Sequence, residues 1–168
     1  MSAADRRPRA GAGWLAVLLA SGLGSGFTRV APGTFGTLAA IVPGILLCRH
    51  PWSLCLAILL ACAAGLWAIP RASGGADHGW IVIDEVAGLW ITLLGIPKPH
   101  DLAWPPSLRE VGWCAAAFAI FRLLDITKPG PIGRLDRRHD TLGVMGDDVL
   151  AGMLGALLLW CARLVLVE

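Results

Sequence analysis

The stretch Trp80-Ile-Val-Ile-Asp84-Glu85-Val-Ala-Gly-Leu-Trp90 is an apolar run that contains two adjacent carboxylates. If the run is a membrane helix, these carboxylates lie roughly 6–7 Å from its start, at about 1.5 Å per residue. An ionisable group inside such a helix costs about 2.5–3.5 kcal/mol on insertion scales, so a sequence that keeps two of them is expected to use them. The stretch therefore predicts a membrane helix with a functional site near one end.

The composition of the whole chain agrees with this interpretation. Its 168 residues are 56% hydrophobic and 15% charged, whereas soluble domains are about 45–50% apolar and about 25% charged. These values exclude a disordered chain, and the length predicts a single domain. The 14 Lys and Arg residues are nearly balanced by 12 Asp and Glu and are scattered between apolar runs, so we expect no nucleic-acid partner.

Apolar stretches recur along the chain and are separated by loops that hold most of the charge. They cover residues 14–27, 34–48, 52–69, 80–96, 110–126 and 146–167. If the N-terminus is cytoplasmic and 14–27 does not cross, most Lys and Arg residues fall on the cytoplasmic side, as the positive-inside rule requires. We therefore expect an all-α, multi-pass helical membrane bundle with about five spans and a short re-entrant or interfacial hairpin at the N-terminus.

In this scheme residues 1–13 form a basic cytoplasmic tail and residues 14–168 form one membrane domain. A secretory signal over residues 6–20 is the alternative interpretation of the N-terminus, because three arginines precede a short apolar run.

Two further apolar stretches carry carboxylates near an end. Asp125 precedes the loop at 127–146, and Asp147 with Asp148 follows it. Because alternating loops share one face of the membrane, these acids converge with Asp84 and Glu85 at one end of the bundle. Clustered carboxylates repel one another unless some are protonated or a divalent cation binds, and oxygen ligands favour Mg²⁺ or Ca²⁺ over zinc. The candidate metal ligands are Asp84, Glu85, Asp125, Asp147 and Asp148.

Groups suited to an anion lie beside these acids. Arg122, Lys128 and Arg29 supply positive charge, and Gly33 and Thr34 begin an apolar helix whose unpaired N–H groups favour phosphate. Carboxylates for a cation and donors for phosphate, together at the membrane surface, indicate metal-assisted chemistry on a lipid phosphate.

Each of these elements also has a purely structural interpretation. Arg122 and Asp125 can form a pair within one helix, and Asp147 and Thr34 are residue types that often cap helices. The arginines between Arg134 and Arg138 are expected in a solvated loop that faces anionic headgroups.

Four segments in a fixed order resemble bacterial phosphatidylglycerophosphatase A. They are Gly24-Ser-Gly-Phe-Thr-Arg-Val-Ala-Pro-Gly-Thr-Phe-Gly-Thr, Asp77-His-Gly-Trp-Ile-Val-Ile-Asp-Glu, Phe121-Arg-Leu-Leu-Asp-Ile-Thr-Lys-Pro-Gly-Pro-Ile and Gly143-Val-Met-Gly-Asp-Asp-Val-Leu-Ala-Gly. The resemblance implies an integral inner-membrane, Mg²⁺-dependent phosphatase that converts the phospholipid phosphatidylglycerophosphate to phosphatidylglycerol. Asp140 and Thr141 depart from the family pattern, which has glycines there.

We therefore expect a phosphomonoesterase with its site on the cytoplasmic face of the bacterial inner membrane. Asp84, Glu85, Asp125 and Asp148 are the candidate catalytic residues, and Arg122, Lys128, Arg29, Gly33 and Thr34 the candidate phosphate-binding residues. The absence of a D-x-D motif in the sequence favours direct attack by water over an aspartyl-phosphate route. The alternative functions are an ion or proton pathway, since intramembrane acids also mark transporters, and a structural membrane subunit.

Overall fold

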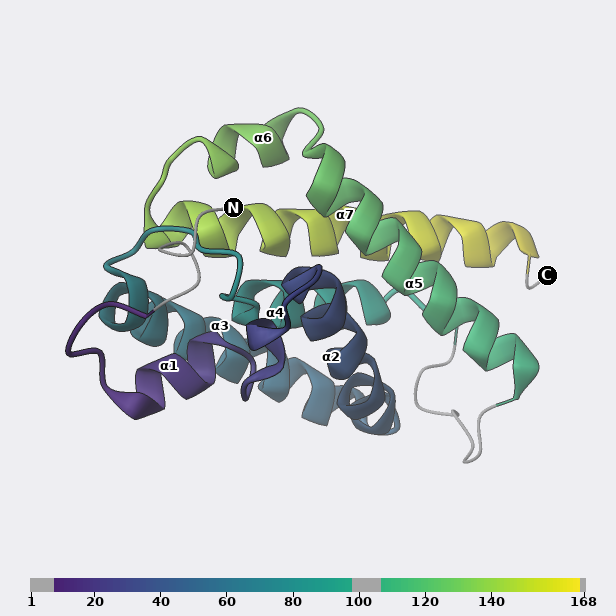
Figure 1. The fold of residues 1–168 in the computed structure, drawn as a ribbon. Helices are drawn as coiled ribbons and strands as arrows, with labels where there is room; N and C mark the ends of the chain where they lie inside the picture. Colours follow the sequence, from purple (N-terminus) through teal and green to yellow (C-terminus); the bar gives the residue numbers. More distant parts are fainter. Residues whose placement is uncertain (1–7, 98–106, 167–168) are drawn as a thin grey trace.

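The computed structural model describes residues 8–97 and 107–166, and over these ranges the chain is helical, with no strand (Figure 1). Seven α-helices and one short 3-10 helix follow in order, which confirms the all-α prediction. They are α1 (Trp14–Ala20), η2 (Ser25–Phe27), α2 (Pro32–Cys48), α3 (Pro51–Ser73), α4 (Ile83–Leu93), α5 (Leu108–Thr127), α6 (Pro131–Asp136) and α7 (Thr141–Leu166).

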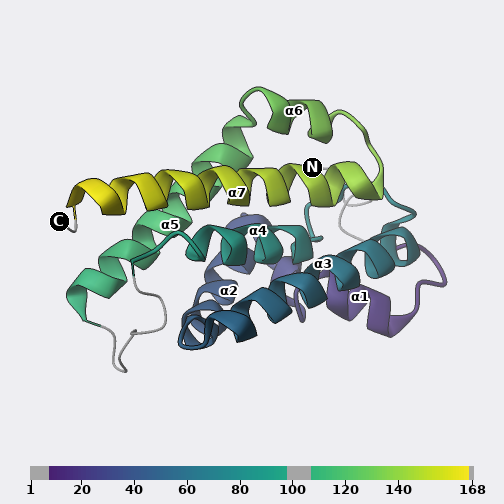
Figure 2. The ribbon, with the colours of Figure 1, turned by 180° about the vertical axis from the view of Figure 1, so that it is seen from behind.

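The short helix α4 lies at the centre of the fold. Two opposite views show it between α7 on one side and α2 and α3 on the other (Figures 1 and 2). It packs against α2, α3, α5 and α7. Helices on several sides explain why its sequence is apolar around most of its circumference. The stretch that carries Asp84 and Glu85 is thus the element around which the other helices assemble.

The structure does not confirm the expected count of about five spans. Within the described residues, two helical segments are long and apolar enough to cross a membrane, namely Trp52–Ser73 within α3 and Thr141–Leu166, which is α7. Helix α4 has 11 residues, which is about 17 Å at 1.5 Å per residue, against about 30 Å of hydrocarbon in a bilayer. Helix α5 has 20 residues, but it carries charges at both ends of its length, including Arg122 and Asp125.

Large apolar side chains remain exposed on the two candidate spans. On α3 they include Leu56, Leu59 and Leu60, and on α7 they include Leu157 and Leu158. Only 28% of the first apolar window and 22% of the second are buried inside the protein. Exposed apolar surface of this kind suits contact with a membrane or another protein.

The N-terminal hairpin packs onto the bundle. Ala16 and Ala20 of α1 belong to a buried cluster with residues of α3, and the Val82 N–H donates to the Ala20 carbonyl at 2.9 Å. Helix α1 has seven residues, about 10 Å, and so cannot cross a bilayer alone. This packing makes 14–27 part of the fold and disfavours a removable signal; residues 1–7 of the predicted tail lie outside the described residues.

The region 127–146 is more helical than the loop expected from the sequence. Pro131 is at the start of α6, a position that proline favours because its fixed φ suits the first turn. Helix α7 begins earlier than expected because Asp140 caps it: the Gly143 N–H donates to Asp140 Oδ1 at 2.7 Å. Asp140 therefore has a local structural role at the position where the family pattern has glycine.

The capping interpretation of two other residues is wrong. Asp147 lies in the second turn of α7, which begins at Thr141. Thr34 is the third residue of α2, whose N-cap is Ala31. Both side chains instead line a cavity.

Candidate active site

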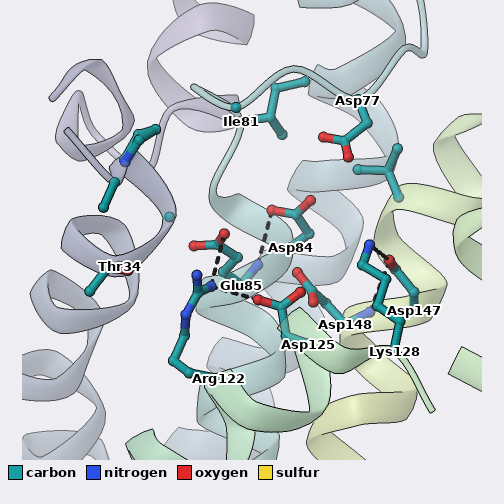
Figure 3. Close-up of a pocket in the computed structure, with 15 residues that line it drawn as sticks. Thr34, Asp77, Ile81, Asp84, Glu85, Arg122, Asp125, Lys128, Asp147 and Asp148 are labelled. Atoms are coloured by element: carbon teal, nitrogen blue, oxygen red, sulfur yellow. Dashed lines mark hydrogen bonds and ion pairs between the residues drawn. The ribbon is translucent and has the colours of Figure 1, made fainter. Parts of the chain in front are cut away.

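A polar cavity of about 430 Å³ lies where α4 and α7 begin and α5 ends (Figure 3). The five carboxylates selected from the sequence all line it, together with Arg122, Lys128, Gly33 and Thr34. The expected convergence of three acidic segments is therefore confirmed. The remaining lining residues are Ala31, Pro32, Asp77, Gly79, Ile81 and Val144.

Helix α4 contributes Asp84 and Glu85 from its first turn. Asp84 is only 5% exposed, and its Oδ1 accepts the Glu85 N–H at 2.9 Å. Glu85 is held on the opposite side by the Thr37 hydroxyl, which donates to Oε2 at 3.1 Å. A Cβ atom at Gly33 would lie 2.2 Å from Glu85 Oε1, so α2 can approach this carboxylate only because residue 33 has no side chain.

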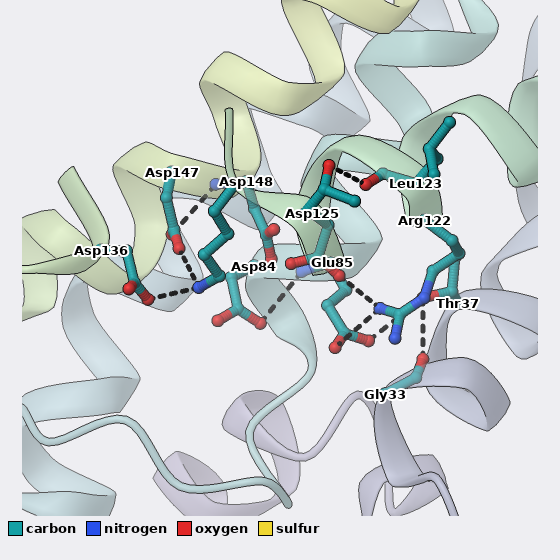
Figure 4. A network of polar contacts seen from close by, with 12 residues as sticks. Gly33, Thr37, Asp84, Glu85, Arg122, Leu123, Asp125, Asp136, Asp147 and Asp148 are labelled. Atoms are coloured by element: carbon teal, nitrogen blue, oxygen red, sulfur yellow. Dashed lines mark hydrogen bonds and ion pairs between the residues drawn. The ribbon is translucent and has the colours of Figure 1, made fainter. Parts of the chain in front are cut away.

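Arg122 joins carboxylates from two helices (Figure 4). Its Nη1 lies 2.6 Å from Asp125 Oδ2 within α5 and 3.1 Å from Glu85 Oε1 on α4. The pair within one helix is thus present, but it is part of a larger network. Arg122 Nε is buried and has no hydrogen-bond partner among the described residues.

Lys128 is the C-cap of α5 and has a left-handed backbone with φ of 45°. Its ammonium contacts Asp136 of α6 and lies 2.7 Å from Asp147 Oδ2 on α7. Partial burial alone would lower the pKa of Lys128, but the hydrogen bonds to these two carboxylates raise it above its ordinary value. The lysine therefore stays protonated and supplies a fixed positive charge at the cavity.

Asp148 is buried among other acids. It is 4% exposed, and its side chain lies close to those of Asp125 and Asp84 in the cavity (Figure 3). Its Oδ1 atom is buried and has no hydrogen-bond partner in the described part of the chain. Its own N–H donates to Asp147 Oδ1 at 3.0 Å, so the two adjacent acids are oriented together.

The donor set has the chemistry that a hard cation requires. Six carboxylates and two cationic side chains line the cavity, and carboxylate oxygens are the ligands that hard cations prefer. Among residues 8–97 and 107–166, however, no three His, Cys, Asp or Glu side chains are arranged as a group that could hold a metal ion. The five predicted ligands thus share one cavity, and their role as ligands stays a prediction.

One residue that the sequence analysis predicted for the site does not line the cavity. Three other residues line the cavity or bind its charged side chains, and the sequence analysis did not select them. Arg29 lines a neighbouring pocket. Asp77 lines the cavity, Thr37 binds Glu85 and Asp136 binds Lys128. Asp77 lies in one of the four segments that resemble the family, so the sequence offered a reason to include it in the site. Asp136 lies among exposed arginines in the sequence, which gives no indication of a role in the site. Its side chain is placed beside Lys128 by helix α6.

The fold and the cavity define an all-helical protein whose acidic site, flanked by two cations, suits chemistry on phosphate esters. Residues 18–163 match the phosphatidylglycerophosphatase A family, and the chain belongs to that family.

Curated relatives support this assignment over most of their length. Phosphatidylglycerophosphatase A of Escherichia coli (strain K12) is 40% identical over 148 residues, which cover 85% of this chain and 80% of that protein. Phosphatidylglycerophosphatase A of Haemophilus influenzae is 38% identical and covers 87% of each chain. A putative phosphatidylinositol-3-phosphatase of Bacteroides thetaiotaomicron is 36% identical and covers 91% of this chain and 96% of that protein. No solved structure matches the chain.

Proposed function

We propose that this protein hydrolyses phosphatidylglycerophosphate to phosphatidylglycerol and phosphate, in a reaction that depends on Mg²⁺. The observation that carries the proposal is the joint presence of clustered carboxylates, Arg122 and Lys128 in one cavity of a phosphatase-family chain. A phosphate monoester dianion entering a cavity with six carboxylates and two cations would be repelled without more positive charge. A divalent cation supplies that charge, and oxygen ligands suit Mg²⁺.

Asp84, Glu85, Asp125, Asp147 and Asp148 would hold the cation. When bound, Mg²⁺ polarises the phosphoryl group and lowers the pKa of water. Arg122 and Lys128, which both line the cavity, would neutralise the charge of the phosphate, with Lys128 acting as a point charge. Glu85, Asp125, Asp136 and Asp147 keep these two cations oriented.

A cavity carboxylate that is not bound to the cation would accept the proton of the attacking water. The water oxygen forms the new bond to phosphorus, and the ester bond to the lipid glycerol breaks. The proton taken from the water passes to the leaving glycerol oxygen, so phosphatidylglycerol and inorganic phosphate are the products. No covalent phosphoenzyme is needed in this route.

The exposed apolar faces of α3 and α7 support an integral position in a membrane. Lys128 lines the cavity and contacts Asp136 of α6. The exposed residues Arg134 and Arg137 lie within α6 and at its C-cap, so the positive-inside rule favours a cytoplasmic site in the bacterial inner membrane. The multi-pass topology with about five spans is part of this proposal. Labelling of Arg137→Cys, in a Cys161→Ala background, by an impermeant maleimide should occur in inverted vesicles and not in right-side-out vesicles.

An ion or proton pathway is less well supported. A relay requires acids spaced across the bilayer, whereas the buried acids among the described residues gather at one cavity. Family membership also favours hydrolysis.

Purified protein in detergent provides the test. Phosphate release from phosphatidylglycerophosphate should occur with Mg²⁺, stop with EDTA and return when Mg²⁺ is restored. Phosphatidylinositol 3-phosphate is assayed in parallel, because the relative from Bacteroides thetaiotaomicron is named for that substrate class. No release from phosphatidylglycerophosphate with Mg²⁺ would reject the proposed function, and undiminished release in EDTA would reject only the role of the metal.

A further inference from the structure

A second, smaller pocket of about 140 Å³ adjoins the carboxylate cavity. Ala31, Pro32 and Gly79 line both spaces, so a thin wall of three residues separates them. The other residues that line this second pocket are Gly26, Phe27, Thr28, Arg29 and Trp80. A ligand group bound here would lie directly beside a phosphate bound in the cavity.

Two buried donors in this second pocket have no partner. Trp80 is 2% exposed, and neither its Nε1 nor the Thr28 Oγ1 has a hydrogen-bond partner among the described residues. An unsatisfied buried donor is costly, and native proteins nearly always pair such groups with protein, water or ligand. Both groups belong to residues that line the second pocket, so they are candidates to pair with acceptor atoms of a ligand bound there.

The charge of the second pocket differs from that of the cavity. Arg29 is the charged residue in its lining, and no carboxylate lines it. A guanidinium with two neutral donors suits a group with a single negative charge and two oxygen acceptors. A phosphodiester has these features, whereas a phosphate monoester is dianionic.

Close packing holds the donors in position. Phe27 stacks on the Trp80 ring with centroids 5.5 Å apart, and a Cβ atom at Gly26 would lie 2.1 Å from the Trp80 carbonyl oxygen. The turn that carries Thr28 and Arg29 therefore lies directly against Trp80, and this contact requires glycine at position 26. The close approach of Gly26 to Trp80 fixes the backbone of the second pocket. Its charged group is the exposed side chain of Arg29.

We propose that this second pocket binds the phosphodiester group of the lipid substrate while its phosphate monoester occupies the carboxylate cavity. The inference rests on the proposed function. In phosphatidylglycerophosphate one glycerol unit joins the two phosphates, which agrees with two pockets that share a wall. Phosphatidylinositol 3-phosphate also combines a phosphodiester with a monoester. Arg29 thereby selects lipids with a diester-linked headgroup, and its binding energy helps to position the reacting monoester.

The two reaction products separate the two pockets experimentally. Phosphatidylglycerol has the phosphodiester but no monoester, and inorganic phosphate resembles only the monoester. Inhibition constants for both products, and kcat/KM for phosphatidylglycerophosphate, are measured for wild type, Arg29→Gln and Trp80→Phe. Trp80→Phe keeps an aromatic ring for Phe27 and removes the N–H. Arg71→Gln is the matched control, since Arg71 is an exposed arginine that stacks on Trp67 away from both pockets.

Arg29→Gln should raise the inhibition constant of phosphatidylglycerol and lower kcat/KM by about 10-fold or more, the loss typical of a charged hydrogen bond. Trp80→Phe should change both in the same direction by about 3-fold or more. The inhibition constant of inorganic phosphate should stay within about twofold in both variants, and Arg71→Gln should resemble wild type. Thermal unfolding in detergent verifies that each variant is folded.

Equal changes in the inhibition constants of phosphatidylglycerol and inorganic phosphate, or no change in either, would overturn the phosphodiester site. The proposed phosphatase function would still stand. Failure of wild type to hydrolyse phosphatidylglycerophosphate would instead reject the proposed function and, with it, this inference. Phosphatidylglycerol that inhibits no better than a lipid without a charged headgroup would also overturn the site.

Discussion

Gly88 of α4 and Gly152 of α7 meet so closely that a Cβ atom at Gly152 would lie 2.4 Å from the Gly88 carbonyl oxygen. Asp84 precedes Gly88 by four residues, and Asp148 precedes Gly152 by four. Residues four apart lie on the same face of a helix, so each acid is one turn from the contact. The approach of the two glycines therefore brings Asp84 and Asp148 into one cavity.

Replacement of Gly152 by alanine should lower both the melting temperature and kcat/KM. Helix propensity alone would favour alanine by about 1 kcal/mol, but the added methyl group must push α7 away from α4. Gly112→Ala in α5 is the matched control, because nothing lies within 4 Å of a Cβ atom there. A more stable and fully active Gly152→Ala protein would show that this contact does not position the acids.

Asp84→Asn and Asp148→Asn should each nearly abolish turnover while the protein stays folded. Each change removes a buried charge without creating a cavity, so the loss reports the chemistry of the site. Activity is measured with Mg²⁺ together with thermal unfolding in detergent. Asp140→Asn serves as control, because asparagine also caps helices. Full activity in either cavity variant would remove that carboxylate from the site.

Gly33→Ala should reduce kcat/KM by about 10-fold or more, equivalent to about 1.4 kcal/mol. The methyl group would displace the Glu85 carboxylate and so disturb its contacts with Arg122 and Thr37. If the effect passes through Glu85, Gly33→Ala should add little to the loss caused by Glu85→Ala. Additive losses in this double-mutant cycle would contradict the interpretation.

Lys128→Met should depress kcat/KM by about 10²-fold or more, a cost near 2.7 kcal/mol. The lysine offers positive charge to the phosphate and also compensates Asp136 and Asp147. Lys128→Arg keeps that charge and should retain more activity. Kinetics are expressed per folded molecule, so reduced expression alone does not count. Wild-type kcat/KM in Lys128→Met would leave the lysine with a structural role only.

Asp140→Gly should leave kcat/KM near the wild-type value and cost only a few tenths of a kcal/mol in stability, because glycine is also tolerated as an N-cap. Asp140→Ala removes the acceptor for the Gly143 N–H and should cost about 1 kcal/mol. Thermal unfolding measures both changes. Inactivation by Asp140→Gly would reveal a catalytic role for Asp140.

The sequence alone determined the helical class, the acidic site and the family. Runs of apolar residues with rare charges are visible in the sequence itself, and the alternation expected of such runs in a helical bundle predicted that Asp84, Asp125 and Asp148 converge. The four segments were sufficient to identify the family, because four motifs in the right order are far more specific than any one of them. These features depend on the local pattern of apolar and charged residues and on the order of the segments along the chain. Both can be read directly from the sequence.

Only the tertiary structure decided which charges are partners and how close the helices lie. Arg29, Arg122 and Lys128 have the same sign, and their sequence positions do not show that Arg29 lines a separate pocket. The contact of Asp136 with Lys128 requires α6, and the length of α4 depends on the helices packed around it. Side-chain pairing and helix approach arise from contacts between distant segments, and the free energy of such contacts depends on distances that exist only in the folded chain.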